Sequence, residues 1–99
     1  MSNRKIEAYN DSSGYYHRYA DTGEACYAER YNEVWSPNVN NIAWVRRDGK
    51  YWHIHVDTGK ACYTERYDWV GSPNVNNIAR VRLDGKGWHI HVDTGEKCQ

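Results

Sequence analysis

Histidines occur in pairs two residues apart, at His53 and His55 and again at His89 and His91. On a β-strand, residues i and i+2 share a face, so each pair could present two imidazoles to one divalent transition metal. His17 precedes His53 by 36 residues, the period of the repeat described below. The alternative is that these side chains lie on a polar outer face and form cross-strand hydrogen bonds. The sequence leaves both readings open, so a divalent metal is a candidate cofactor but none is required.

The triplet Asp-Thr-Gly occurs three times, at 21–23, 57–59 and 93–95. In an aspartic protease, such a carboxylate shares a proton with a second one inside an enclosed apolar site. Here Glu or Lys follows each triplet, and the triplets fall at expected hairpin turns, where Asp, Thr and Gly are typical without any chemistry. No nucleophile and base stand apart from the repeated background, so we expect no catalytic residues and no enzymatic activity.

Three cysteines, Cys26, Cys62 and Cys98, occupy one position of the repeat. Equivalent positions in stacked units rarely come within disulfide reach, and an odd number of cysteines argues against a disulfide framework. We therefore expect free, partly buried thiols and a reducing, cytoplasmic location.

Asparagine-rich loops lie next to aromatic residues in both halves of the chain. Asn tolerates left-handed backbone and closes Asx turns, which explains the loops without a ligand. Amide groups beside indole and phenol rings could also bind a sugar, a nucleotide or a protein partner. On the second reading, the candidate binding residues are Trp35, Trp69, Asn38, Asn40, Asn74, Asn76, Tyr31 and Tyr67.

The chain is an internal duplication with a period of 36 residues. Residues 21–56 and 57–92 share 28 of 36 positions. Residues 1–20 read as a degenerate N-terminal unit and residues 93–99 as the start of a further copy. We therefore expect one small domain of 99 residues made from these four pieces.

Each unit is expected to be a three-stranded antiparallel meander, and the whole chain is expected to be all-β. Asp48-Gly49 and Asp84-Gly85 each separate two strand-like runs, which predicts two-residue type I′ turns. In the first unit the strands should cover roughly 41–47, 51–56 and 61–66. In the last strand Trp88, Ile90 and Val92 should form the buried face.

One such unit cannot cover its own apolar face, so the units must stack or pair with another chain. The tryptophan moves by two residues between the units, from Trp35 to the position of Trp69, and thereby stays on the same side of its strand. An exposed sheet edge at the end of the stack invites pairing, so we expect a homo-oligomer.

Composition excludes several classes of partner. Lys+Arg and Asp+Glu are both 13, so the chain has no basic excess for nucleic acid or an anionic membrane. Apolar runs are only a few residues long, too short for a transmembrane helix or a signal peptide. The apolar residues include 5 Trp and 9 Tyr but no Phe, and Trp and Tyr suit half-buried contact surfaces.

The order of turn and strand residues resembles the WG-repeat (KWG) group of bacterial proteins. The pattern in the second unit consists of Tyr67, Asp68, Val70, Ala79, Val81, Asp84, Gly85, His89, Ile90 and Gly95. The preceding unit supplies Tyr31, Val34, Ala43, Val45, Asp48, Gly49, His53, Ile54 and Gly59. Asn41 and Asn77 stand where the family has Gly, which Asn can replace in left-handed backbone. The resemblance implies a β-rich repeat scaffold with a binding role and no catalytic residues.

The sequence as a whole therefore predicts a non-enzymatic module that presents duplicated Trp, Tyr and Asn surfaces to a protein partner. The alternative is a homo-oligomer that binds a small ligand or a divalent metal where units or subunits meet.

Overall fold

The computed structural model describes residues 4–98, which form strands and no helix. The ten strands are β1 (Ile6–Asp11), β2 (Gly14–Tyr19), β3 (Glu33–Val34), β4 (Ile42–Arg47), β5 (Lys50–His55), β6 (Lys60–Ala61), β7 (Trp69–Val70), β8 (Ile78–Leu83), β9 (Lys86–His91) and β10 (Glu96–Lys97). The expected all-β class is confirmed. None of the described residues belongs to a helix that is long and apolar enough to cross a membrane.

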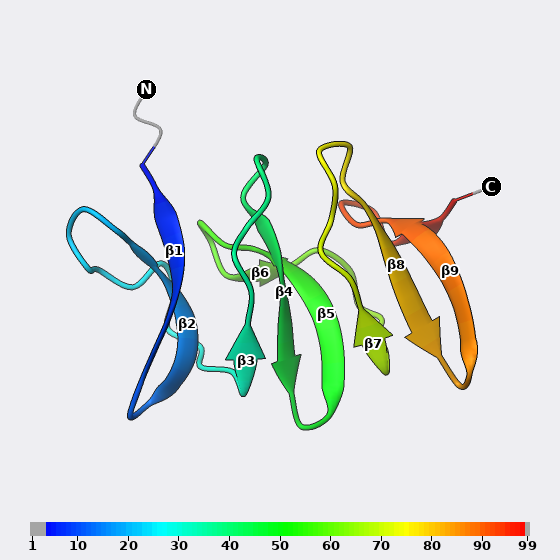
Figure 1. Cartoon of the computed structure of the whole chain (residues 1–99), viewed down its shortest axis with the longest axis horizontal. Helices are drawn as coiled ribbons and strands as arrows, with labels where there is room; N and C mark the ends of the chain where they lie inside the picture. Colours follow the sequence, from blue (N-terminus) through cyan, green and yellow to red (C-terminus); the bar gives the residue numbers. More distant parts are fainter. Residues whose placement is uncertain (1–3, 99) are drawn as a thin grey trace.

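All strand pairs are antiparallel, and each sheet follows chain order. β1 and β2 form a hairpin, and two four-stranded sheets follow in the orders β3-β4-β5-β6 and β7-β8-β9-β10. The three long hairpins β1–β2, β4–β5 and β8–β9 succeed one another along the long axis of a molecule of 40 × 32 × 16 Å (Figure 1). Each hairpin begins 36 residues after the previous one.

Two details differ from the expected three-stranded meander. The third strand, expected over 61–66, is only the two residues of β6, because the chain then turns away from the sheet. The segment after the expected third strand supplies β7 at the edge of the next sheet. Each full sheet therefore has two long central strands and two short outer ones.

The turns have the backbone that their residues predict. Asp48 and Gly49 have φ of 55° and 81°, and Asp84 and Gly85 repeat these values closely at 53° and 80°. Positive φ at both central residues is the mark of the expected type I′ turn. The Asn that replaces a family Gly is also left-handed, with φ of 60° at Asn41.

Each full sheet has an apolar face and a face that carries the histidines. In the first sheet the apolar face consists of Ala43, Val45, Trp52, Ile54 and Val56, all of them buried. The opposite face, called here the histidine face, consists of Ile42, Trp44, Arg46, Tyr51, His53 and His55. In the last sheet the histidine face consists of Ile78, Arg80, Arg82, Gly87, His89 and His91.

The sheets stack with aromatic linkers between them. Tyr31, in the linker after β2, exchanges two backbone hydrogen bonds of 2.9 and 3.0 Å with Tyr15, and its ring meets the ring of Trp52 on the next apolar face at 5.9 Å. Tyr67 repeats this arrangement with Tyr51 and Trp88 one period later. The histidine face of one unit is thus covered by the linker and the apolar face of the next unit.

Substitution of two glycines with the same backbone angle should separate packing from backbone strain. Gly59 and Gly49 have φ of 80° and 81°, so alanine is strained at both. A Cβ at Gly59 would lie 2.6 Å from Cβ of Tyr27, whereas a Cβ at Gly49 would meet nothing within 4 Å. We expect Gly59→Ala to cost about 2 kcal/mol more free energy of unfolding than Gly49→Ala, as measured by urea titration. Equal losses would contradict the packing of this turn against the preceding linker.

Candidate binding surface and the histidine junctions

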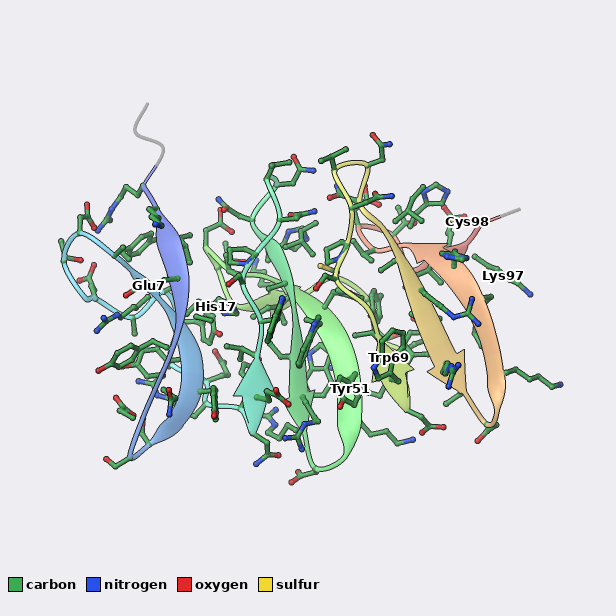
Figure 2. The ribbon with its side chains drawn as sticks, viewed as in Figure 1. Glu7, His17, Tyr51, Trp69, Lys97 and Cys98 are labelled. Atoms are coloured by element: carbon green, nitrogen blue, oxygen red, sulfur yellow. The ribbon has the colours of Figure 1, made fainter. Side chains whose placement is uncertain are left out.

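His17 and His53 lie at the centre of the two contacts between successive units. Both are completely buried. In each, one ring nitrogen, Nδ1, lies 2.6 Å from a tyrosine Oη, that of Tyr27 or Tyr63. The other, Nε2, lies 2.7 Å from the carbonyl oxygen of Trp35 or 2.8 Å from that of Gly71 in the next unit. We call each such arrangement a histidine junction; Figure 2 shows His17 in the space between β2 and the following sheet.

The partners of the ring fix the protonation state of these histidines. A carbonyl oxygen can only accept, so Nε2 carries the proton and donates it. In the neutral ring Nδ1 then accepts from the tyrosine hydroxyl. Burial lowers the pKa of His53 to about 4 and also lowers that of His17, which keeps both rings neutral at pH 7.

The first histidine pair, His53 and His55, therefore does not lie on an outer face as expected, whereas His89 and His91 do. The expectation of an outer position is wrong for His53, because the next sheet covers it. His89 and His91 are exposed, and His55 is half-buried. Within residues 4–98 no three His, Cys, Asp or Glu side chains gather closely enough to hold a metal ion. The metal hypothesis thus gains no support from the geometry.

The asparagine loops bind each other. Nδ2 of Asn38 and Nδ2 of Asn40 both donate to Oδ1 of Asn77, at 3.0 and 2.9 Å. Oδ1 of Asn38 accepts from the backbone of Asn40, and Asn74 repeats this Asx turn in the second unit. Asn38 and Asn40 are therefore used in holding the two repeats together, which favours the turn reading over a ligand site at the first loop.

Two further candidate residues belong to the core. Tyr31 and Tyr67 are 6% and 3% exposed, so their rings are not free to meet a partner. Asn74 and Asn76, by contrast, are exposed, and within the described residues their side-chain nitrogens donate no hydrogen bond.

Trp35 and Trp69 are the candidates that the structure leaves on the surface. They are 54% and 43% exposed. Trp35 is stacked on Trp44, with the ring centroids 6.0 Å apart and the planes at 5°. A Cβ at Gly71 would lie 3.3 Å from the indole of Trp69, so this ring extends over Gly71. Gly71 stands at the repeat position of Trp35. The expectation that the shifted tryptophan stays on the same face is confirmed.

Trp69, Arg80 and Arg82 line a surface pocket of about 410 Å³. Trp69 lies directly opposite Arg82 in the strand register, where the first repeat has Glu33 opposite Arg46. Glu33 and Arg46 form an ion pair of 3.3 Å, whereas no ion pair of Arg80 or Arg82 occurs within residues 4–98. The two arginines were not among the residues expected from the sequence, although the exchange of Glu33 for Trp69 between the repeats was the available signal.

The three cysteines are free and half-buried, as expected. Burial raises the pKa of the Cys62 thiol to about 12 and also raises that of Cys26. A thiol with a raised pKa is a poor nucleophile at neutral pH. The Asp-Thr-Gly triplets lie at turns with left-handed glycines, as at Gly59 and Gly95.

Comparison with known proteins agrees with the repeat. The model of the WG-containing repeat matches residues 30–51 and 66–86, which run from the linker through the first long strand of each sheet. No curated protein and no solved structure matches the chain.

Proposed function

Residues 30–51 and 66–86 are WG-containing repeats, and from this premise we propose that the chain is a non-enzymatic binding module that presents Trp35 and Trp69 to a protein partner. The observation that supports this most directly is the exposure of both indoles, 54% and 43%, from neighbouring sheets. Tryptophan is among the residues that carry the most binding energy in protein interfaces.

The surroundings of the two indoles suggest the chemistry of the partner. Trp35 lies on Trp44 next to the Glu33–Arg46 ion pair, whereas Trp69 lies beside two arginines without such a pair. Arginine binds carboxylates with two parallel hydrogen bonds. A partner with two apolar or aromatic groups, of which the one at Trp69 is flanked by an acidic group, would satisfy both sites. Two linked sites raise the overall affinity without a new kind of contact.

Loss of both indoles should abolish capture of the partner. We expect the variant Trp35→Ala/Trp69→Ala to weaken binding by a hundredfold or more, since each buried tryptophan contributes about 2 kcal/mol at an interface. Affinity purification from cells finds the partner, and titration of the purified partner then gives the dissociation constant.

The matched control is Val39→Ala/Val75→Ala, which removes two apolar side chains that are 76% and 66% exposed but lie in the asparagine loops. This control should bind like the unchanged protein. Equal binding by the tryptophan variant, with its circular dichroism unaltered, would overturn the proposal.

A small ligand is the second candidate, because the pocket of about 410 Å³ falls in the range of small-molecule sites. An anion with a planar ring would stack on Trp69 and pair with Arg82. Displacement of the protein partner by such a ligand would distinguish the two candidates.

A further inference from the structure

The last sheet carries a third histidine junction that lacks its covering segment. His89 stands at the position of His17 and His53 on an equivalent strand, and its backbone oxygen accepts from Cys98 as theirs do from Cys26 and Cys62. His17 and His53 are buried completely, whereas His89 is exposed. The difference arises because no linker follows β10 within the described residues.

The two covered junctions define what fits there. Each is covered by a nine-residue linker, residues 27–35 or 63–71, with the pattern Tyr-x-Glu-Arg-Tyr-x-x-Val-x. Its first tyrosine bonds to Nδ1 of the histidine at 2.6 Å in both copies, and its last carbonyl accepts from Nε2 at 2.7 or 2.8 Å.

The linker makes two further contacts that also occur in both copies. Its arginine lies over an aromatic ring, at 3.8 Å for Arg30 above Tyr16 and 4.1 Å for Arg66 above Trp52. Its second tyrosine exchanges two backbone hydrogen bonds with the edge of the long strand, as between Tyr67 and Tyr51, both of 2.9 Å.

The last sheet has an equivalent of each group that the linkers contact in the two covered junctions. His89 supplies both ring nitrogens, Trp88 is half-buried with its ring met by Lys97 at 5.4 Å, and Gly87 stands at the place of Tyr51 on the strand edge. Tyr27 and Tyr63 have their third repeat equivalent at position 99, which is Gln in this chain.

At the opposite end of the stack, the face of the β1–β2 hairpin that corresponds to the apolar face of the first sheet is polar. Glu7 and Arg18 stand where Ala43 and Ile54 stand in the first sheet, and they form an ion pair of 2.6 Å. The guanidinium of Arg18 also lies 3.6 Å from the ring centroid of Tyr9. Polar end units of this kind close repeat stacks. The open docking surface is therefore the one at β9 (Figure 2, beside Lys97 and Cys98).

We propose that the edge of β9 around His89 is a docking site for an extended peptide segment with the linker pattern Tyr-x-x-Arg-Tyr-x-x-Val-x. The segment adds to the sheet edge by backbone hydrogen bonds at Gly87, and its first tyrosine and last carbonyl bind the two nitrogens of His89. This site adjoins the pocket at Trp69, because Arg80 and Arg82 lie opposite His89 and Gly87 in the strand register. It does not depend on the function proposed above.

The test uses a labelled synthetic peptide with the sequence of residues 63–71, capped at both ends, and the full chain. We expect saturable binding by fluorescence anisotropy and amide shifts at Gly87 and His89 in NMR spectra. His89→Phe removes both ring hydrogen bonds and should weaken binding at least tenfold. His91→Phe, on the same strand and face, should change binding less than twofold.

Two altered peptides test the contacts from the other side. Phe in place of the first tyrosine should weaken binding about tenfold, and an N-methyl group on the second tyrosine, which blocks its backbone donor, should abolish it. No saturable binding up to millimolar peptide, or equal binding by His89→Phe and the unchanged chain, would overturn the proposal.

Discussion

Replacement of His53 by leucine is expected to lower the free energy of unfolding by about 4 kcal/mol. Leucine fills part of the space but leaves the hydroxyl proton of Tyr63 without its acceptor and the carbonyl of Gly71 without its side-chain donor. An unpaired buried polar group costs about 1–3 kcal/mol, and both losses occur at one contact between sheets. Urea titration followed by circular dichroism measures the change.

The repeat supplies a matched control for this substitution. His89→Leu alters the same repeat position, but the side chain is exposed and its ring has no partner within residues 4–98. This variant should change the free energy of unfolding by less than about 0.5 kcal/mol. Similar losses from His53→Leu and His89→Leu would show that burial between sheets is not what stabilises the histidine position.

Stability should fall as the pH is lowered from about 6.5 to about 4. The pKa of His53 is about 4 in the folded protein and 6.5 in the unfolded chain, because burial disfavours the charged ring. The unfolded chain therefore binds more protons in this window, and the stabilisation, fully present above pH 6.5, is lost as the pH falls. The loss from His53 alone amounts to about 3 kcal/mol, and His17 adds to it in the same direction.

Other titratable groups contribute little to the change in stability between pH 6.5 and pH 4. The groups that face the His53 ring are the hydroxyl of Tyr63, whose pKa burial raises, and the carbonyl of Gly71. Hydrogen bonds from Ser13, Arg4 and Lys50 lower the pKa values of Asp11, Asp21 and Asp68. The stability that these carboxylates contribute is lost mainly as the pH falls below 3.8. Thermal unfolding at pH 7, 5.5 and 4.5 measures the effect. If the thermal stability of His53→Leu falls with pH as steeply as that of the unchanged protein, the pH dependence does not arise from His53.

Much of the fold could be predicted because it depends on local sequence. The Asp-Gly dipeptides require left-handed backbone, and alternation along the strands assigns Ile90 and Val92 to the buried face. The shift from Trp35 to Trp69 could also be interpreted correctly, because a two-residue step preserves the side of a strand.

The burial of His53 could not be predicted, because it depends on the following sheet. Within one unit the alternation assigns this histidine to the polar face. The linker of the next unit, which ends at Gly71, then covers the ring. Residues 1–20, which contain the hairpin β1–β2, could be predicted only as a degenerate unit for a related reason. Strands β1 and β4 have little in common beyond their first residues, Ile6 and Ile42. Where β4 has Ala43 and Val45, β1 has Glu7 and Tyr9, at the end of the stack.

Trp35 and Trp69 were named as candidate contact residues because tryptophan suits half-buried contact surfaces, and both are exposed in the structure. The asparagines of the first loop were indistinguishable in sequence from those of the second, yet Asn40 bonds to the next repeat while Asn76 has no following loop within residues 4–98. Identical residues therefore have different roles because their neighbours in the stack differ.

The central claim is that a buried, neutral histidine joins each unit to the next. Nitrogen-15 NMR of the imidazole rings at pH 7 tests it most directly. The account predicts slowly exchanging Nε2 protons on His17 and His53, with through-space contacts from the His53 ring to Tyr63 and Gly71, and rapid exchange on His89. A His53 ring proton that exchanges as fast as that of His89 would contradict the account.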